Sequence, residues 1–433
     1  MEYSTEQLEL LTKQWKANRS FIVEKFRDEL ITTDLLDLSI SLAYDWINFF
    51  VNVHFGVKDF KTIESGIQTF FQHKEFRSLS EEKKAPLYNM LGISYGYQGV
   101  FLKAIQWYRE ALCIAETLND YLGSAIYCSN IGLNFTYIGL FYEAEEIFFR
   151  GLEYLNRGDS QNSENFGIES ALRINLGELY RRNSKFEQSQ EQLERALLIN
   201  EKIIGVDEQL ENLAETLESL LKCYISIENL EEAKNAFNKI EALNFTEESR
   251  FGELHRLRAR GYYFWKIKQD YDISENYFQE SIDLAMKIEA GEYLFQSQVL
   301  LAEMLVEKAI KLVNIDFNMV KNTLEKLENL TKQVIRYANK QQLFGLMAET
   351  FLIRTEYFLV EQDFTNAYNS IAEATAIIIS NNLDHLVERL DTVEIQLNNN
   401  IPRTENFSQI NNLNLTQLRH YLSKIQQIFT SEN

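Results

Sequence analysis

Side chains that could do acid–base, nucleophilic or metal chemistry are scattered along this 433-residue chain. The histidines and cysteines are His54, His73, His255, His385, His420, Cys113, Cys128 and Cys223. None of the histidines stands at a metal-ligand or catalytic-base spacing from a second such residue, and isolated cysteines mostly behave as small buried apolar groups. The chain also lacks a glycine-rich phosphate loop and a serine nucleophile elbow. The sequence therefore predicts a protein that is not an enzyme and that needs no cofactor and no metal.

The charge of the chain limits its partners. The formal net charge is −21 and no extended basic run occurs, which disfavours nucleic acid and anionic lipid. The N-terminus carries Glu2, Glu6 and Glu9 where a targeting peptide has basic and apolar residues. The most apolar stretch, from Trp46 to Val57, is too short to span a bilayer. We therefore expect a cytoplasmic protein with no nucleic-acid partner and no membrane partner.

Helices must position whatever site the chain has. Only 2 prolines and 17 glycines punctuate the chain, which is sparse for a sheet protein with frequent turns. Apolar residues recur at three- and four-residue spacing, and no two-residue alternation competes with that pattern. The sequence therefore predicts an all-α fold.

A repeated spacing organises the middle of the chain. After a Leu-Gly or similar pair, an aromatic residue follows the Gly by three positions, and small, large apolar and small residues follow it by 12, 16 and 19. The clear copies are Leu91, Gly92, Tyr95, Ala104, Tyr108, Ala111; Ile131, Gly132, Phe135, Ala144, Phe148, Gly151; and Leu176, Gly177, Tyr180, Ser189, Leu193, Ala196. Weaker copies are Leu220, Leu221, Tyr224, Ala233, Phe237, Ile240; Tyr262, Trp265, Ser274, Phe278, Ser281; and Phe358, Ala367, Ile371, Ala374. Residues 292–338 indicate a degenerate helix pair with a lengthened turn near 313–318.

The spacing suits two helices that pack face to face. Residues three and four apart lie on one face of a helix, so each half of the unit presents one apolar face. The small residues let the two backbones approach, and the large ones fill the space between the helices and the next unit. Because one unit cannot bury its face alone, the units are expected to stack.

This spacing resembles the tetratricopeptide repeat over roughly residues 84–380. The resemblance implies a right-handed superhelical α-solenoid of stacked antiparallel helix pairs. Two features depart from the family: no proline stands between repeats, which predicts less sharply defined turns, and the glycine steps from Gly92 to Gly132 to Gly177 are 40 and 45 residues rather than 34. The longer period is similar to that of kinesin light chain, the Pins-type adaptors and the Rap-type peptide receptors.

The repeat array is expected to span residues 84–397, with further segments on both sides. Residues 1–83 read as helices without the repeated spacing, the first from about Ser4 to Leu30, and form either a cap or a separate helical bundle. Residues 398–433 read as a linker, starting at Asn398, and an amphipathic helix from Ser408 to Phe429. That helix either folds back as a cap, docks in the array's own groove, or pairs with a second copy of the chain to form a homodimer.

The family resemblance also implies a binding surface on the concave wall, formed by the first helix of each unit. Family positions two residues before the Gly and one, four and five after it face the ligand. Together with a nearby arginine, they give the candidate residues Tyr97, Asn130, Tyr137, Asn175, Arg181, Arg182, Lys222, Arg256, Arg260, Tyr263 and Lys266. The amides of Asn130 and Asn175 either hold the backbone of an extended peptide or bond to the neighbouring helix.

Two functions fit these residues. The first is a non-catalytic adaptor whose basic and aromatic wall binds a peptide or partner segment, with an acidic segment as the preferred ligand. The second is a regulatory receptor of the Rap type, in which a short peptide closes the superhelix and shifts the N-terminal helices. Ligand-induced compaction distinguishes the receptor from the adaptor.

Overall fold

The computed structural model describes residues 35–56, 59–158, 163–203, 207–246, 249–313 and 315–400. These residues form helices and turns, with no β-strand among them, which confirms the all-α prediction. The α-helices are α3 (Ile40–Gly56), α4 (Phe60–Phe70), α5 (Glu81–Tyr97), α6 (Phe101–Leu118), α7 (Tyr121–Ile138), α8 (Phe141–Arg157), α9 (Ser163–Arg182), α10 (Phe186–Ile203), α11 (Asp207–Ser226), α12 (Leu230–Glu241), α13 (Arg250–Tyr263), α14 (Tyr271–Lys287), α15 (Gly291–Leu312), α16 (Phe317–Gln341), α17 (Phe344–Val360), α18 (Phe364–Ser380) and α19 (Val387–Asn400). Short turns of helix are η1 (Phe76–Ser78), the π-helical η2 (Phe264–Lys268) and η3 (Asp384–Leu386).

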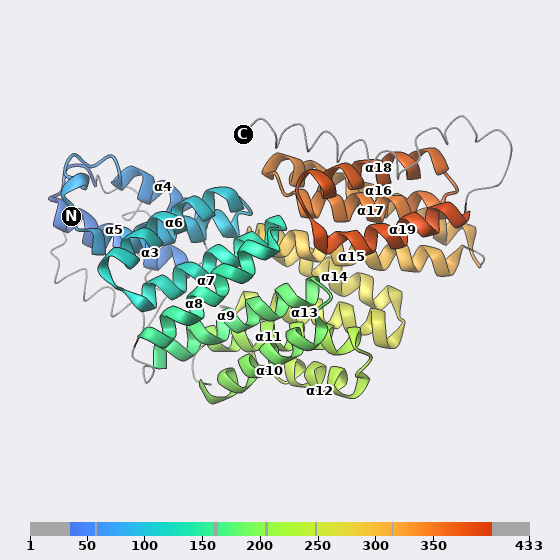
Figure 1. Ribbon diagram of the computed structural model, residues 1–433, viewed down its shortest axis with the longest axis horizontal. Helices are drawn as coiled ribbons and strands as arrows, with labels where there is room; N and C mark the ends of the chain where they lie inside the picture. The colour runs from blue at the N-terminus through green and yellow to red at the C-terminus, as the bar shows by residue number, and fades with distance from the viewer. Residues whose placement is uncertain are drawn as a thin grey trace.

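Consecutive helices pack as pairs, from α5 with α6 to α17 with α18, and each pair packs on the next. The first helices of successive pairs also contact one another, in the order α7, α9, α11, α13, α15 and α17. Figure 1 shows the pairs following an arc, from α5–α8 at the left, through α9–α13 at the bottom, to α15–α19 at the upper right. The chain is therefore an α-solenoid of stacked helix pairs, as the repeated spacing predicts.

Glycines of the repeated spacing lie where the two helices of a pair approach closely. A Cβ atom on Gly132 would lie 2.4 Å from the ring of Phe148, and one on Gly92 would lie 2.5 Å from the ring of Tyr108. A Cβ atom on Gly177 would likewise lie 2.5 Å from the Leu193 side chain. Larger residues at these positions would push the paired helices apart. The predicted pairing of a small residue with a large one sixteen positions later is thus confirmed in the three clear copies.

The fifth copy is displaced by one residue from its predicted register. A Cβ atom on Gly261, rather than on Tyr262, would lie 2.6 Å from the ring of Phe278. Gly261 precedes Phe278 by 17 positions instead of 16, and the π-helical turn η2 between them absorbs the extra residue. The contact between the two helices of this copy is therefore made at Gly261 and not at Tyr262, where the copy was counted from.

Three turns between pairs are tight although no proline occupies them. At the end of α6, Asn119 adopts a left-handed conformation with φ 56°, and Asp120 then accepts a hydrogen bond from the Gly123 amide at 2.9 Å. Glu289 and Gln342 have φ 53° and 58° at the junctions before α15 and α17. A left-handed residue stops one helix and fixes the start of the next. The expectation of less sharply defined turns is wrong at these junctions.

The flanking helices continue the stack where the structure describes them. Helix α4 packs on both α3 and α5, and the ring of Phe60 stacks on that of Tyr97 with centroids 4.3 Å apart. Helix α19 packs on α17 and α18 and extends to Asn400, through the start of the predicted linker. The predicted first helix, the C-terminal helix and its pairing with a second copy lie outside the described residues. The division at residues 83 and 397 stays a prediction.

Candidate functional site

A cavity of about 780 Å³ lies inside the curve of the solenoid. Its wall comes mainly from α7, α9, α11, α13, α15 and α17, with η3 and α19 closing one side. The volume falls within the ~300–1,000 Å³ that is usual for small-ligand pockets. The first helices of the pairs therefore face inward, and the space suits a short ligand rather than a folded domain.

Residues far apart in the sequence meet at the wall of this cavity. Gln296 on α15 donates a hydrogen bond to the Tyr137 hydroxyl on α7 at 3.1 Å. Arg182, at the end of α9, donates to the Glu349 carboxylate on α17 at 3.2 Å. Distant parts of the array thus contact each other, and both contribute to the wall of the cavity.

Five of the predicted binding residues line the cavity. They are Tyr137, Asn175, Arg181, Arg182 and Lys222. The Asn175 amide donates to the Ser129 hydroxyl on α7 at 3.2 Å, so this donor is used to hold α9 and α7 together.

The other six predicted residues lie away from the cavity wall: Tyr97, Asn130, Arg256, Arg260, Tyr263 and Lys266. The Asn130 amide donates to the Asn89 side chain at 3.0 Å, the alternative in which it bonds to the neighbouring helix. Lys266 pairs with Glu307 at 2.9 Å, and Arg256 pairs with Glu253.

The register error explains why two of these residues face elsewhere. Arg260 makes two hydrogen bonds of 2.8 and 2.9 Å to Glu241 on α12, and Tyr263 stacks on Phe237 with ring centroids 3.9 Å apart. Counted from Gly261, the position one residue later is Tyr262, and Tyr262 does line the cavity. A shift of one residue turns a helical side chain by about 100°.

A buried carboxylate gathers three nitrogen-bearing side chains at the cavity wall. Glu218, only 2% exposed, accepts hydrogen bonds from Arg258 at 2.7 and 3.0 Å and lies 2.7 Å from the Nδ1 atom of His255. Lys222 pairs with the same carboxylate. Burial alone would raise the pKa of Glu218, but the charges of Arg258 and Lys222 outweigh it and hold that pKa well below its usual value.

The remaining cations of the wall are paired as well. Arg181 makes two hydrogen bonds of 2.7 and 2.8 Å to Glu178, and Arg389 donates to Glu303 at 2.7 Å. Each of these arginines is partly shielded from solvent, and burial opposes their charge, yet the adjacent carboxylates raise the pKa of both. The cationic side chains named here for the inner wall are therefore all held in ion pairs.

His385 adds a neutral aromatic surface to the cavity. Its ring stacks on Phe141 with centroids 3.8 Å apart, joining η3 to the start of α8. Burial, together with the nearby charge of Arg182, lowers the pKa of His385 to about 3. The imidazole is uncharged at neutral pH and acts as a packing group between the two ends of the array.

Comparison with known sequences and structures identifies this architecture. A sequence model of the tetratricopeptide repeat matches residues 171–209. A Rap protein solved in complex with competence and sporulation factor superposes with a TM-score of 0.52 over 92% of this chain and 100% of that one, at 14% identity. Residues 171–209 therefore match the tetratricopeptide repeat in sequence, and the chain has a tetratricopeptide-like fold.

Two other solved structures resemble the tetratricopeptide-like array more loosely. NprR, in complex with its cognate peptide NprX, has a TM-score of 0.47 at 15% identity, over 77% of this chain and 91% of that one. BtubC (BKLC) from P. vanneervenii has a TM-score of 0.39 at 21% identity, over 54% of this chain and 94% of that one. A comparison with functionally curated proteins finds no match.

Several wall residues of this tetratricopeptide-like array were missed by the sequence analysis. Among the missed residues that carry charge are Glu218, Arg258, Glu303, Glu349 and Arg389. Those on α15 and α19 lie outside the recognised copies, and α17 contributes only Phe358 to a weak copy, so the repeated spacing did not place them on the wall. Arg258 lies three positions before Gly261, not two, so even the corrected register does not place it among the family positions.

The described part of the chain contains neither a metal-ion cluster nor a membrane-spanning helix. No group of three His, Cys, Asp or Glu residues there is arranged to hold a metal ion. None of the helices in these ranges combines the length and hydropathy needed to cross a membrane.

Proposed function

We propose that this protein binds a short peptide in the cavity and that the peptide holds the two ends of the repeat array together. The repeat match and the fold support a role as a protein-interaction scaffold. The observation that supports binding of a peptide between the two ends is the shared wall. There, α7 and α9 meet α15 and α17 through Tyr137, Gln296, Arg182 and Glu349. A ligand that prefers this arrangement shifts the population toward it.

The chemistry of the wall suits a peptide with both charges. Each ion pair presents a cation and a carboxylate side by side, so a bound terminus or side chain of either sign finds a partner. Tyr137, Tyr262 and Phe295 add aromatic surface to the cavity. We therefore extend the expected ligand from an acidic segment to a peptide of mixed charge.

A second candidate is a static adaptor that binds an extended segment of a larger partner. The Asn175–Ser129 hydrogen bond favours the static adaptor, because it fixes α9 to α7 and the two helices need not move when a ligand binds. Small-angle scattering separates the two: the receptor becomes more compact with bound peptide, whereas the adaptor keeps its radius of gyration.

Two threonines provide a matched test of cavity binding. Thr392 lines the cavity, whereas Thr117 lies on the outer helix α6; both are exposed, and each hydroxyl donates to the carbonyl four residues earlier, at 2.9 and 2.8 Å. Pools of a positional-scanning pentapeptide library with free termini serve as the probe, and thermal unfolding is the measurement. Peptide at about 100 times its Kd stabilises the folded state by about 2.7 kcal/mol.

We expect the same pools to raise the Tm of the wild type and of Thr117→Trp more than that of Thr392→Trp, in which the indole occupies part of the cavity. If no pool stabilises the wild type, or if Thr392→Trp responds as fully as Thr117→Trp, the peptide is not held in this cavity.

A further inference from the structure

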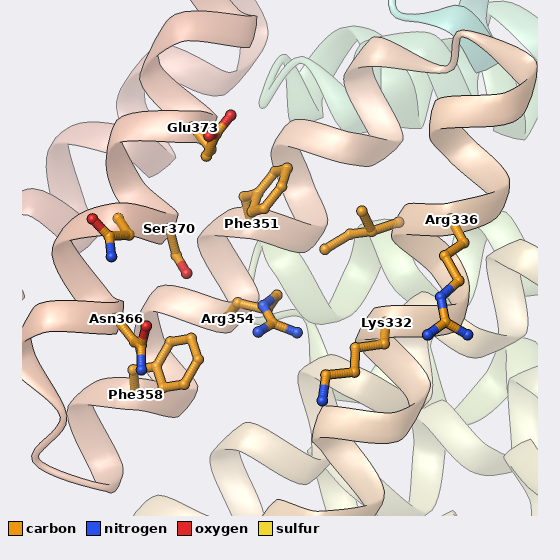
Figure 2. A pocket seen from close by; sticks show the side chains of 10 residues that line it. Lys332, Arg336, Phe351, Arg354, Phe358, Asn366, Ser370 and Glu373 are labelled. Atoms are coloured by element: carbon orange, nitrogen blue, oxygen red, sulfur yellow. The ribbon is translucent and has the colours of Figure 1, made fainter.

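A second concavity lies on the other side of the C-terminal helices. It measures about 360 Å³ and is formed by α16, α17 and α18. Figure 2 shows Lys332 and Arg336 on one side, Asn366, Ser370 and Glu373 on the other, and Arg354 between them. We call this concavity the outer groove.

Helical spacing brings these side chains to one place. Phe351, Arg354 and Phe358 follow one another on α17 at steps of three and four, so they share the face that forms the floor. The lining residues of α16 and of α18 recur at steps of three and four as well. Each helix thus turns one continuous face toward the outer groove.

The floor combines aromatic surface with a fixed arginine. The Arg354 guanidinium lies 5.2 Å from the centroid of the Phe358 ring and donates to the Thr331 hydroxyl at 3.4 Å. Stacking on the ring and this hydrogen bond hold the guanidinium in place while leaving most of its donors unused. An incoming carboxylate would find the donors already oriented.

The cations of the outer groove differ from those of the central cavity in their partners. Within the described ranges, no carboxylate lies at ion-pairing distance from Arg336 or Arg354. Lys332 pairs with Glu328 at 2.6 Å, but both side chains are more than one third exposed, where such a pair is weak. In a chain of net charge −21, two arginines without carboxylate partners beside one exposed lysine form a local reversal of sign.

The opposite wall is polar and ends in one acid. Asn369 and Ser370 on α18 carry groups that both donate and accept hydrogen bonds, as a peptide backbone does. Glu373 lies one turn beyond Ser370, at one end of the groove. Its charge repels an anion at that end and so favours one direction of a bound chain.

From these contacts we propose that the outer groove binds an acidic peptide segment in which an aromatic or aliphatic side chain lies between carboxylates. The carboxylates pair with Arg336, Arg354 and Lys332, and the apolar side chain covers Phe351 and Phe358. The strong negative charge of the whole chain disfavours a polyanion such as nucleic acid, because an extended phosphate backbone would run onto acidic surface. The outer groove shares no lining residue with the central cavity, so this proposal is tested separately from peptide binding in the cavity.

The test uses a phage-displayed library of random octapeptides selected on the full-length Thr392→Trp protein, whose central cavity is partly occupied by the indole. The enriched peptide is then measured by fluorescence anisotropy at 50 and 300 mM NaCl. Arg336→Glu reverses one exposed charge of the groove, and Lys234→Glu reverses an exposed charge on α12 as the matched control.

We expect enriched peptides with two or more Asp or Glu residues around a Phe, Tyr or Leu. Arg336→Glu should weaken binding about tenfold or more, because charge reversal turns a close attraction into repulsion, whereas Lys234→Glu should change it less than twofold. Higher salt should weaken the wild-type complex. Arg336→Gln gives a second reading that does not depend on the reversed charge, and both variants are checked for an unchanged Tm.

Three results would overturn the proposal. One is a selection without acidic enrichment, the second is equal affinity of Arg336→Glu and the wild type, and the third is tighter Arg336-dependent binding of a 20-nucleotide single strand than of the peptide.

Discussion

The guanidinium of Arg182 lies 3.2 Å from the carboxylate of Glu349, which is 167 positions further along the chain. The same guanidinium donates to the Thr136 carbonyl at 3.2 Å and lies over the Phe141 ring at 5.4 Å. Arg182 therefore joins the ends of α7 and α9 to α17. A solenoid whose units contact only their neighbours has no such bond, so this contact closes the array.

Exchange of the two charges tests the closure. Arg182→Glu should lower the free energy of unfolding and raise the radius of gyration, because it places two carboxylates together. The double variant Arg182→Glu plus Glu349→Arg should recover part of both. Both side chains are at most one fifth exposed, so a coupling energy of about 0.5–3 kcal/mol is expected from the double-mutant cycle. Urea unfolding and small-angle scattering measure it, and additive effects of the two single variants would show that the pair does not hold the ends.

Local spacing predicted the helix pairs because a pair is closed by residues within about forty positions. Leu91, Ile131 and Leu176 are all buried in one core cluster, as units built on one plan require. The lengthened turn also appears where it was expected, since α15 ends at Leu312 and α16 begins at Phe317.

The site was less predictable for physical reasons. One extra residue in the π-helical turn moved Arg260 and Tyr263 off the inner wall, and no composition signal marks such an insertion. The pairing of Arg182 with Glu349 depends on the curvature summed over many units, and the spacing of residues within one repeat does not determine that curvature. The basic wall inferred from Arg181 and Lys222 proved to be paired with glutamates from the same helices.

The close approach of paired helices gives a stability prediction with its own control. Gly132→Ala should destabilise the fold by about 1–3 kcal/mol, because the new methyl group meets the Phe148 ring. Gly167→Ala, in helix α9 with nothing within 4 Å of the new Cβ, should instead stabilise by about 0.5–1 kcal/mol through helix propensity. Urea unfolding compares the two, and equal effects of both substitutions would contradict the packing described for the first three copies.

The thiols should differ sharply in reactivity. Burial raises the pKa of Cys128 to about 12, and burial also raises the pKa of Cys223, whereas Cys113 is exposed. The thiolate is the reactive form, so the native protein at pH 8 should react quickly with Ellman's reagent at one thiol and the unfolded protein at all three. Cys113→Ser should abolish the fast phase. Rapid reaction of a second thiol in the folded wild type would mean that α7 or α11 opens on the timescale of the assay.

The buried Glu218 should make stability depend on pH. Its pKa is held well below the usual value of about 4.5 in the folded state, so its contribution is fully present above that value and is lost as the pH falls toward the folded-state pKa. Glu218→Gln should cost about 3–5 kcal/mol at pH 7, because Arg258 and Lys222 lose a buried counter-charge.

The difference between the wild type and Glu218→Gln should then shrink as the pH is lowered from 7 to 3.5, because the unfolded wild type takes up a proton at Glu218 near pH 4.5 while the folded protein keeps this carboxylate ionised. Urea unfolding at a series of pH values measures this difference. Glu228→Gln, an exposed site at the turn after α11, serves as the control and should show a small difference at every pH. A gap for Glu218→Gln that stays constant across the series would mean that the carboxylate keeps its ordinary pKa and that Arg258 and Lys222 do not stabilise its charge.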